Sequence, residues 1–526
     1  MSSTEVTFAA PGPGTWELDA THRGRRPFSP FLREAMLHEV AGGFRVVAEG
    51  YGIPLADVRA ALVNGCLYFR MVGIGESDKP SKPPPAWAMK VMTRLHPELR
   101  RRKRTAKRAW RDRRWRHEVD NFFERERATV VAANLELQRV DLGLLTDDEL
   151  ADAVLVRLAH FATQARRNIE THGGDLIPAG DFLAHCRRWG IDDTEATALL
   201  RGSSPATVQT ATLLAPVGKA QAVDAWLELH GWRIITTDDI DRPALAERPS
   251  LQLAALLAAA KAPPDPDATP DADATRRQVP PAERGTFDAL LAEARYGMRQ
   301  RDDNVGVRWN WSAGLLRRAL LECARRLVAR GALERADDVF ELAPSELGPL
   351  LRNGTGPTAA EVAARAAFRD RVEAARAPHR LGPVEEPPPF DVFPPALARA
   401  TAAIFAVMEA EGIASESTGD DLRGTGIGRR TYRGTARVAT SADDALDRLE
   451  PGDVLVAPYT GPAYNSLLPI LGALVVEAGG TMCHAAIVAR EFSVPAVVGV
   501  AGATTRIPDG ARLEVDPVEG RVAILD

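Results

Sequence analysis

One histidine stands where it can do chemistry. In GGTMCHAAIVARE, residues 479–491, His484 follows a glycine pair and opens a run with helical spacing. A strand, a turn through Gly479 and Gly480 and a helix beginning near His484 would place the imidazole beside unpaired backbone N–H groups and the positive end of a helix dipole. That end attracts phosphate and disfavours imidazolium, so the neutral ring stays nucleophilic. The residues expected to cradle a phosphoryl group are Gly479, Gly480, Thr481 and Cys483.

The same residues allow a plainer interpretation. A histidine at the start of a helix can serve only to cap the helix or to fill space. Cys483, directly before His484, can be a reactive thiol, but a lone cysteine more often packs as a small apolar residue, which is the interpretation we adopt. The four cysteines show no CxxC pair and no zinc spacing, so the sequence predicts neither disulfides nor a metal site.

The elements around His484 form a compact module. After about Leu422 the chain contains six short β-branched stretches bounded by Gly, Pro and Asp, which is typical of strands, and one clear helix, HAAIVAREF. We therefore expect a C-terminal α/β domain of the β/β/α type. The expected strands lie in TARVAT, GDVLVAP, GALVVEA, PAVVGV, ARLEVD and RVAIL.

The rest of the chain is predicted to be mainly α-helical. Apolar residues recur at three- and four-residue steps in DDELADAVLVRLAHFATQARRNIETH and AGLLRRALLECARRLVARG. Two proline-rich stretches, 261–281 and 377–395, interrupt this pattern, and we interpret them as a linker or exposed loop and as a hinge. The expected units are a helical N-terminal region (1–260), a Pro/Asp-rich linker or loop (261–285), a helical continuation (286–376), a proline-rich hinge with a connecting helix (377–423) and the C-terminal domain (424–526).

Composition limits function only loosely. The 526 residues carry a formal net charge of −5 and a pI near 6.1, so the whole chain has no charge-driven attraction to nucleic acid or to an anionic membrane. No basic segment followed by an apolar core opens the chain, and no run of about 18 apolar residues occurs. We expect a multidomain protein of the reducing cytoplasm, without a membrane partner.

One stretch is strongly basic. Residues 98–118, ELRRRKRTAKRAWRDRRWRHE, combine arginines and lysines with Trp110 and Trp115, a combination that can bind phosphate backbones and stack bases. On a helix, the tryptophans can instead anchor a buried face while the arginines pair with nearby acids. We favour a structural helix, or an electropositive docking surface for an acidic partner, over a nucleic-acid site. The nearby acids are Glu118, Glu124 and Glu126.

The motifs from Gly424 onward resemble a known family. The glycine pair, His484, AAIVARE, VPAVVGV, DG and a closing strand follow the order found in the swivelling phosphohistidine domain of the phosphoenolpyruvate (PEP)-utilising enzymes, which include phosphoenolpyruvate synthase, pyruvate phosphate dikinase and rifampin phosphotransferase. The resemblance implies that His484 takes a phosphoryl group from a nucleotide-binding domain and swings it to a second site. Two positions depart from the family pattern. Met482-Cys483 replaces Thr-Ser or Met-Thr, and Thr460-Gly461-Pro462 replaces T-D-P.

Weaker similarities extend into the helical region. Residues 14–69 resemble the opening of stand-alone members related to phenylphosphate synthase, and LELHGWRIITTDDIDRPALAERPS and RQRDDNVGVRWN resemble two further elements of the superfamily. Their polar residues are candidates for an acceptor site, with Asp303 as a base, although a solvated helix cap is an equally open interpretation. We interpret His160 and His172 as packed polar residues. The acceptor-site candidates are Arg301, Asp302, Asp303, Asn304, His230 and Arg233.

The implied function is phosphoryl transfer through a phosphohistidine. The sequence has no GxxxxGK[ST] motif and no segment resembling the family's ATP-grasp domain, so ATP and Mg²⁺ are expected on a separate ATP-grasp partner. We predict a dikinase-type phosphotransferase component in which His484 passes the group to a hydroxyl of a small organic acceptor, such as a phenol or a rifamycin-like polyketide. The alternative is a non-catalytic interaction or regulatory protein that keeps the fold, which the departures at Met482-Cys483 and Gly461 and the missing nucleotide site favour.

Overall fold

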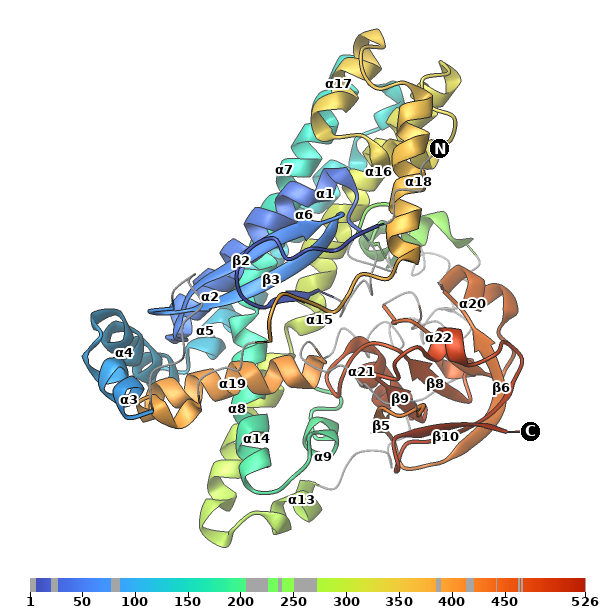
Figure 1. Ribbon diagram of the computed structural model, residues 1–526. Helices are drawn as coiled ribbons and strands as arrows, with labels where there is room; N and C mark the ends of the chain where they lie inside the picture. Colours follow the sequence, from blue (N-terminus) through green and yellow to red (C-terminus); the bar gives the residue numbers. More distant parts are fainter. Residues whose placement is uncertain are drawn as a thin grey trace.

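The computed structural model shows a mainly helical body followed by an α/β domain (Figure 1). The long helices α7 (Asp147–Thr171) and α16 (Trp311–Ala329) run through the body, and α19 (Pro395–Glu411) leads to the C-terminal domain. No helix in the described part of the chain is both long and apolar enough to cross a membrane. The described residues are 6–19, 27–76, 86–204, 226–234, 239–249, 272–384, 389–412, 421–440, 442–461, 464 and 467–525.

The body is mainly helical as predicted, but its N-terminal part also contains a four-stranded antiparallel sheet that the sequence analysis does not predict. The strands β2 (Leu55–Val63) and β3 (Cys66–Gly73) form a hairpin within the order β2-β3-β1-β4. The hairpin turns at Asn64-Gly65, both with positive φ (52° and 83°), which is the pair that tight hairpin turns prefer. A search for helical periodicity does not detect the Asn64-Gly65 turn. The other strands are β1 (Trp16–Leu18) and β4 (Arg380–Leu381).

Helices form most of the remaining body, and the segments with three- and four-residue apolar spacing are helical as expected. Among the described residues, three π-helical turns interrupt the helices: η1 (Met36–Val40), η2 (Phe122–Glu126) and η7 (Val305–Asn310). The other helices of the body are α1 (Pro30–Ala35), α2 (Ala41–Tyr51), α3 (Ala86–Leu95), α4 (Pro97–Arg111), α5 (Arg114–Asn121), α6 (Arg127–Arg139), η3 (Leu142–Leu144), α8 (Gly173–Arg188), α9 (Asp193–Ala198), η4 (Leu245–Glu247), α14 (Arg284–Met298), α15 (Arg301–Asn304), η8 (Ala336–Glu341), α17 (Pro344–Asn353), α18 (Ala359–Ala374) and η9 (Phe390–Val392).

Part of the range predicted as a linker, 261–285, is helical. Residues 261–271 lie outside the described residues, but α13 (Ala272–Gln278) and η6 (Pro281–Glu283) follow them. Val279 is 1% exposed in a core shared with Phe287, and the hydroxyl of Thr275 donates to Glu195 at 2.7 Å. A single buried valine and a few polar contacts therefore fix a segment whose composition alone indicates a linker.

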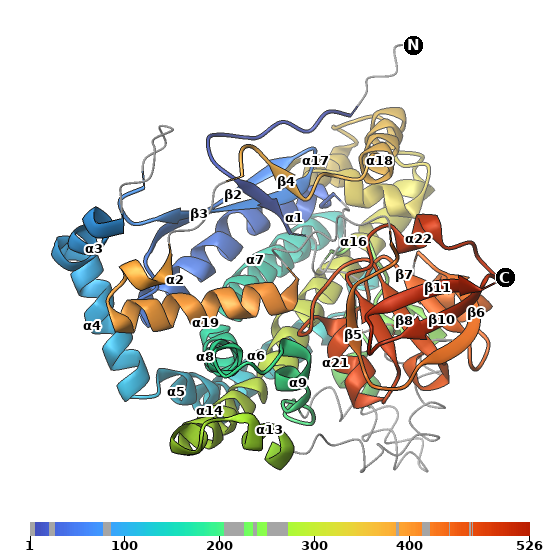
Figure 2. The same ribbon diagram turned by 60° about the horizontal axis from the view of Figure 1, so that its bottom comes forward.

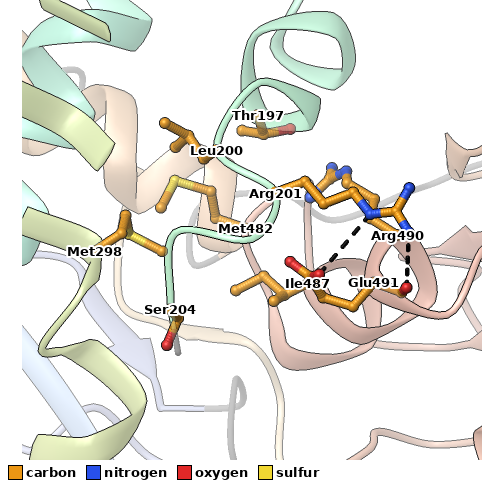
Figure 3. A pocket seen from close by; sticks show the side chains of 9 residues that line it. All are labelled: Thr197, Leu200, Arg201, Ser204, Met298, Met482, Ile487, Arg490 and Glu491. Carbon is orange, nitrogen blue, oxygen red and sulfur yellow. Dashed lines mark hydrogen bonds and ion pairs between the residues drawn. The ribbon is translucent and has the colours of Figure 1, made fainter. Parts of the chain in front are cut away.

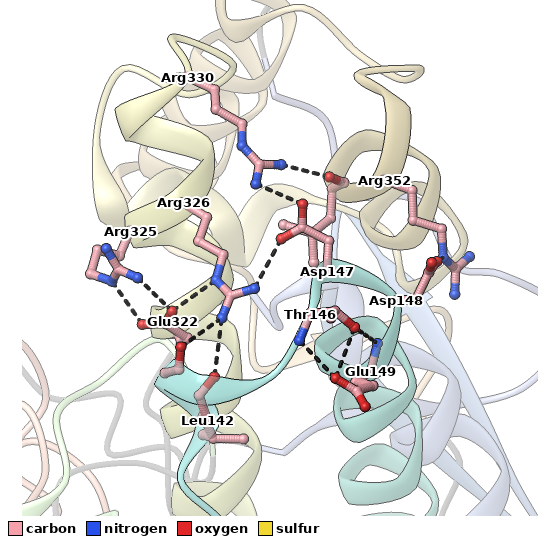
Figure 4. Close-up of polar contacts among 12 residues, drawn as sticks. Leu142, Thr146, Asp147, Asp148, Glu149, Glu322, Arg325, Arg326, Arg330 and Arg352 are labelled. Carbon is pink, nitrogen blue, oxygen red and sulfur yellow. Dashed lines mark hydrogen bonds and ion pairs between the residues drawn. The ribbon is translucent and has the colours of Figure 1, made fainter.

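An ion-pair network joins the two longest helices at one end of the bundle (Figure 4). Thr146 caps α7, because its hydroxyl accepts the N–H of Glu149 while the Glu149 carboxylate accepts the N–H of Thr146. The carboxylate of Asp147, in the first turn of α7, pairs with Arg326 at 2.9 Å and with Arg330 at 2.6 Å. Both arginines lie at the end of α16, so the start of one helix is tied to the end of the other.

Helix α8 carries the connecting helix α19. Figure 2 shows α8 end-on between α19 and α14, the two helices that it contacts most. A Cβ added to Gly180 would lie 1.9 Å from the backbone oxygen of Ala403 on α19, so only glycine permits this approach. The next residue, Asp181, accepts hydrogen bonds from the guanidinium of Arg399 on α19. The connecting helix within 377–423 is thus present and is packed on the helical body.

We expect Gly180→Ala to lower the free energy of unfolding by about 1–3 kcal/mol, because the added methyl group forces α8 and α19 apart. Gly285, in the first turn of α14, has no heavy atom within 4 Å of an added Cβ. Gly285→Ala should therefore change stability by no more than about 1 kcal/mol, in the stabilising direction. Thermal or denaturant unfolding of both variants makes the comparison, and equal stabilities would contradict the packing argument.

The C-terminal domain is built on a curled seven-stranded sheet of order β11-β10-β6-β7-β8-β9-β5. Strands β6 to β9 pair in parallel, and the other pairs are antiparallel. Leu455 and Leu474 belong to a core with α21, while Val456 and Val475 belong to a second core. The expected strands and the helix HAAIVAREF are present. The elements are β5 (Thr425–Ile427), β6 (Tyr432–Val438), α20 (Ala442–Arg448), β7 (Val454–Ala457), η11 (Leu468–Ile470), β8 (Ala473–Val476), α21 (His484–Glu491), β9 (Ala496–Val498), α22 (Ala503–Arg506), β10 (Arg512–Asp516) and β11 (Arg521–Leu525).

Candidate functional site

His484 is the first residue of α21, at the helix start that the sequence predicts. The preceding residue, Cys483, is the N-cap, with φ −65° and ψ 162°, and its side chain makes no capping hydrogen bond. The imidazole is partly buried, and its Nδ1 lies 3.0 Å from the hydroxyl oxygen of Thr460. Thr460 comes from the loop after β7, so two segments of the domain orient the ring. Pro462, in the same departing motif, lies outside the described residues.

The glycine pair before His484 packs against the end of α19. The N–H of Gly480 donates to the carbonyl of Glu411 at 3.1 Å. The N–H of Met482 donates to the carbonyl of Ala410 at 2.7 Å. A Cβ on Gly480 would lie 2.5 Å from the Ala410 oxygen, and Gly479 has a φ of 109°, so both positions need glycine. The pair therefore places the loop on the helical body, and the Gly480 N–H is used there rather than for phosphate.

The other two residues predicted to cradle phosphate differ from each other. The N–H of Cys483 donates to the Gly480 carbonyl at 3.3 Å, and burial raises the pKa of the Cys483 thiol to about 11. The thiol is therefore a packing group, as expected. Thr481 is 5% exposed, and its hydroxyl has no hydrogen-bond partner among the described residues. That hydroxyl remains available to a ligand.

Met482 anchors the C-terminal domain in the helical body. Its side chain is 2% exposed and belongs to a core that includes Met298 of α14 and Ala406 and Ala410 of α19. Burying a methionine contributes about 2 kcal/mol. Met482, in the pair Met482-Cys483 that departs from the family pattern, thus has a structural use in this chain.

We expect Met482→Thr to weaken the docking of the C-terminal domain by about 2 kcal/mol, because the smaller polar side chain loses most of this apolar contact. Faster limited proteolysis after α19 and a larger radius of gyration in small-angle scattering would report the change. Val518 is 67% exposed in the same domain, so Val518→Thr is the matched control and should have no effect. Identical proteolysis of the two variants would show that Met482 is not an anchor.

Arg301 joins the helical body to the loop that carries His484. Its Nη2 donates to the Glu411 carboxylate at 2.6 Å and to the Met482 carbonyl at 3.1 Å. Its Nη1 is buried and has no hydrogen-bond partner among the described residues. This guanidinium therefore keeps one donor unused while it is bonded to the carbonyl of Met482, two residues before His484. This acceptor-site candidate therefore lies at the contact between the two parts of the molecule.

The two acids that follow Arg301 have different surroundings. Asp302 accepts the hydroxyl of Ser204 at 2.8 Å, and burial raises the pKa of its carboxyl, with a smaller contribution from the charge of Asp175. Asp303, the residue proposed as a base from the sequence, is paired with Arg127 at 2.5 Å. Its carboxylate is thereby committed to a structural ion pair.

The remaining acceptor-site candidates are integrated into the helical body. His230 stacks on Trp226 with ring centroids 4.9 Å apart, and burial lowers the pKa of His230 to about 2. Burial also lowers the pKa of Arg233 to about 10, and its guanidinium lies over the ring of Trp311. Asn304 is fully buried and is held in side-chain hydrogen bonds. These contacts differ from a solvated helix cap.

A pocket lies beside α21, between the two parts of the molecule (Figure 3). Ile487 and Glu491 follow His484 by about one and two turns on one face of α21, and both line the pocket. Arg201, in the loop after α9, donates to the Glu491 carbonyl at 2.8 Å, and the Gly202 N–H donates to the Glu491 carboxylate at 2.7 Å. The helical spacing in HAAIVARE predicts that Ile487 and Glu491 share a face with His484. The loop after α9 contains no motif that would predict its part in the pocket. The lining residues are Thr197, Leu200, Arg201, Ser204, Met298, Met482, Ile487, Arg490 and Glu491.

The basic stretch 98–118 forms α4 and α5, and its tryptophans have structural partners. The indole N–H of Trp110 donates to Asp181 at 2.9 Å, and that of Trp115 donates to Glu293 at 2.7 Å. Arg114 pairs with Glu118 at 2.7 Å, whereas Glu126 pairs with arginines outside this stretch. The contacts agree with the structural helix. The preference for an acidic partner over nucleic acid as a ligand of the exposed cations stays a prediction.

Comparisons with known proteins show what the C-terminal domain is similar to. The family model of the PEP-utilising enzyme mobile domain matches residues 449–520, which contain Thr460 and His484. A rifampicin phosphotransferase of Streptomyces sviceus is 29% identical over 334 residues, which are 58% of this chain and 34% of that protein. The phosphoenolpyruvate synthase of Escherichia coli is 42% identical over 97 residues, 18% of this chain and 12% of that protein.

A third relative, an uncharacterised protein of Mycobacterium tuberculosis, is 33% identical over 238 residues, 45% of this chain and 24% of that protein. This chain therefore spans about a third or less of the length of each of these relatives. The matched segment contains the glycine pair, His484 and the strands that carry the sequence resemblance. Residues 449–520 are therefore similar to the mobile domain of the PEP-utilising enzymes.

Proposed function

We propose that this chain is a phosphotransferase component in which His484 carries a phosphoryl group from a separate ATP-binding protein to a hydroxyl of a small organic acceptor. The observation that carries the proposal is the position of the His484 loop, docked on the helical body beside the unused donor of Arg301. A histidine that relays a phosphoryl group must come close to the site that receives the group. In this chain the loop that carries His484 contacts the helical body.

Thr460 supports the chemistry of the first transfer. When its hydroxyl oxygen accepts the Nδ1 proton of His484, the lone pair is left on Nε2, which attacks the phosphorus atom. The P–O bond to the donor breaks, and its electron pair stays on the leaving phosphate oxygen. The product is an Nε2-phosphorylated imidazolium whose Nδ1 proton stays on the ring and is donated in a hydrogen bond to the hydroxyl oxygen of Thr460.

Arg301 and Thr481 support the second transfer. The acceptor oxygen forms a bond to phosphorus, the P–N bond breaks, and its electron pair returns to Nε2 of His484, which leaves as a neutral imidazole. Charge on the phosphoryl oxygens during this step needs fixed donors. The Arg301 Nη1 and the Thr481 hydroxyl are buried donors without partners among the described residues, and both lie on or against the His484 loop.

We assign ATP and Mg²⁺ to the partner chain. The sequence has no P-loop motif, and among the described residues no group of three or more His, Cys, Asp or Glu side chains is arranged to hold a metal ion. An ATP-grasp protein encoded next to this chain is the partner that the proposal requires.

A second candidate function is a regulatory or interaction protein that keeps the mobile-domain fold without transfer. Met482 is buried in the helical body and the Gly480 N–H is used by Glu411, and these two contacts favour a permanently docked domain. The carboxylate of the family's T-D-P motif is also absent, because Gly461 occupies its position.

Labelling distinguishes the two functions. The full chain is incubated with the neighbouring ATP-grasp protein and with ATP labelled at the β- or γ-phosphate. The relay predicts protein-bound label that survives alkali and is lost in acid, as expected for a phosphoramidate. The regulatory function would instead be supported if the chain takes up no label but changes the rate at which the ATP-grasp protein turns over nucleotide.

A further inference from the structure

Helix α3 presents an apolar face to solvent. Trp87, Val91 and Leu95 follow one another at four-residue steps, so they form a ridge along one side of the helix. Trp87 is 71% exposed, Leu95 is 67% exposed, and Val91 and its neighbour Met92 are also exposed. Single exposed apolar side chains are ordinary on a protein surface, but a contiguous group on one short helix indicates a contact surface.

The opposite side of α3 is anchored to the helical body, and this contact fixes the direction of the ridge. The buried hydroxyl of Thr93 donates to the carbonyl of Val392 in η9 at 2.8 Å. Lys90 pairs with the carboxylate of Asp391, also in η9, at 2.9 Å. Thr93 lies two positions from the ridge residues on either side of it, which is about 160° around a helix. The ridge therefore points away from the body.

The helix that follows α3 is strongly basic. Residues 86–111, which form α3 and α4, contain ten lysines and arginines and one glutamate, in a chain whose net charge is −5. Leu99, Ala106 and Ala109 bury one face of α4, so most of its cations face solvent. Together with the four apolar residues of α3, these exposed cations make up the α3–α4 surface. They are Arg100, Arg101, Arg104, Lys107, Arg108 and Arg111.

The α3–α4 surface lies at the edge of the molecule away from the C-terminal domain, as Figures 1 and 2 both show. Helix α19 connects the two regions, because it contacts η9 and α4 on one side and ends at the His484 loop. Its length of 17 residues corresponds to roughly 25 Å. A partner bound to the α3–α4 surface therefore leaves the His484 loop uncovered.

The apolar ridge argues against nucleic acid as the ligand of these cations. Phosphates and base faces offer no apolar partner to Val91, Met92 and Leu95. The two tryptophans within the basic stretch, Trp110 and Trp115, are bonded to carboxylates of the body and are not free to stack on bases. The α3–α4 surface therefore fits a ligand that has both an apolar and an acidic side.

The shape of the ridge favours a helix over a membrane. Side chains at i, i+4 and i+8 form the kind of ridge against which a second helix packs. A bilayer is a flat surface, and anionic headgroups would meet the exposed carboxylate of Asp391 beside Lys90. Acidic side chains on the flanks of a bound helix can instead be placed opposite the cations of α4 alone.

We propose that the α3–α4 surface binds an acidic amphipathic helix of another protein. The apolar face of that helix lies on Trp87, Val91 and Leu95, and its Asp and Glu side chains pair with the exposed cations of α4. The inference does not depend on the proposed function, because no residue of the α3–α4 surface takes part in phosphoryl transfer.

Two labelled peptides test the proposal with the full chain. Both have about 18 residues, or five helical turns, of Leu, Ala and Glu. One has its leucines along one helical face, and the other has the same composition in scrambled order. Fluorescence anisotropy measures their binding. We expect the amphipathic peptide to bind at least about tenfold more tightly than the scrambled one, because only the former matches the ridge.

Substitutions on the ridge identify the binding surface. The double variant Trp87→Ser and Leu95→Ser should weaken binding of the amphipathic peptide by roughly tenfold or more, because large apolar side chains at the centre of a contact carry most of its affinity. Leu144 is 84% exposed elsewhere on the body, so Leu144→Ser is the matched control and should bind as wild type does. Equal effects of the two changes would contradict the proposal.

Substitutions on α4 test the charge. The triple variant Arg104→Gln, Lys107→Gln and Arg108→Gln should weaken binding and reduce its dependence on salt, because these exposed cations face the acidic flanks of the peptide. Arg429 and Arg430 are exposed on the C-terminal domain, and their change to Gln should alter neither quantity.

The outcomes also separate the possible ligands. Equal affinity for the amphipathic and scrambled peptides would overturn the proposal, because charge alone would then explain binding. Tighter binding to vesicles of phosphatidylcholine and phosphatidylserine, or to a single-stranded oligonucleotide, that is lost in the Trp87→Ser and Leu95→Ser variant would assign the surface to a membrane or to nucleic acid instead. Labelling of His484 reports the proposed function independently of each of these results.

Discussion

The His484→Gln chain is expected to take up no phosphoryl label from ATP and the partner protein, and to support no acceptor phosphorylation. Glutamine keeps a polar side chain at the start of α21 and a group that the Thr460 hydroxyl can contact, but it has no nitrogen lone pair that attacks phosphorus. Because the phosphohistidine is a covalent intermediate, its loss abolishes turnover and does not merely raise KM. Label retention on the protein is measured after alkaline denaturation.

A matched control keeps this result interpretable. His185 lies on α8 of the helical body, and its Nδ1–H donates to the Asp181 carbonyl 2.7 Å away, so His185→Gln removes a histidine that the relay does not use. It should label as wild type does. Acceptor phosphorylation that proceeds unchanged in His484→Gln would show that the phosphohistidine mechanism is wrong and that the domain is a retained scaffold.

The secondary structure of the C-terminal domain could be predicted from the sequence because its elements are short and clearly bounded. The strand segments around Leu455 and Leu474 are apolar and end at Gly, Pro or Asp, and the helix start at His484 follows a glycine pair. Each local signal therefore agrees with the tertiary structure. The N-terminal sheet was overlooked because its strands alternate weakly, and only the Asn64-Gly65 turn marks the hairpin.

The sequence predicts a residue of the site only where that residue lies within a recognisable motif. His484 and Arg301 are each identified by their own motif, but their association depends on the packing of α19 against α8, which no local pattern records. The interpretation of His172 as a packed polar residue leaves out Asp175, three residues further on, whose carboxylate contacts the ring. The spacing between them is visible in the sequence. The break between α7 and α8 that brings their side chains together is not.

Arg301→Gln should leave the labelling of His484 intact and reduce transfer to the acceptor by roughly 10³-fold or more, because a fixed arginine at a phosphoryl group contributes an effect of this size. In the proposed relay the first transfer takes place on the ATP-binding partner, where Arg301 has no part. In the second, the Arg301 Nη1 is the buried donor available to the phosphoryl oxygens, while Nη2 holds the Glu411 carboxylate and the Met482 carbonyl.

Two further variants separate charge from docking. Arg299 is exposed two residues earlier and lies over the rings of Phe123 and Tyr296, so Arg299→Gln removes the same charge without touching the His484 loop and should transfer normally. Arg301→Lys keeps the charge but cannot hold two acceptors and a phosphoryl group at once, so it should recover docking in small-angle scattering more fully than transfer. If Arg301→Gln lost labelling and transfer equally, Arg301 would act before the phosphohistidine forms, and the helical body would belong to the first step rather than the second.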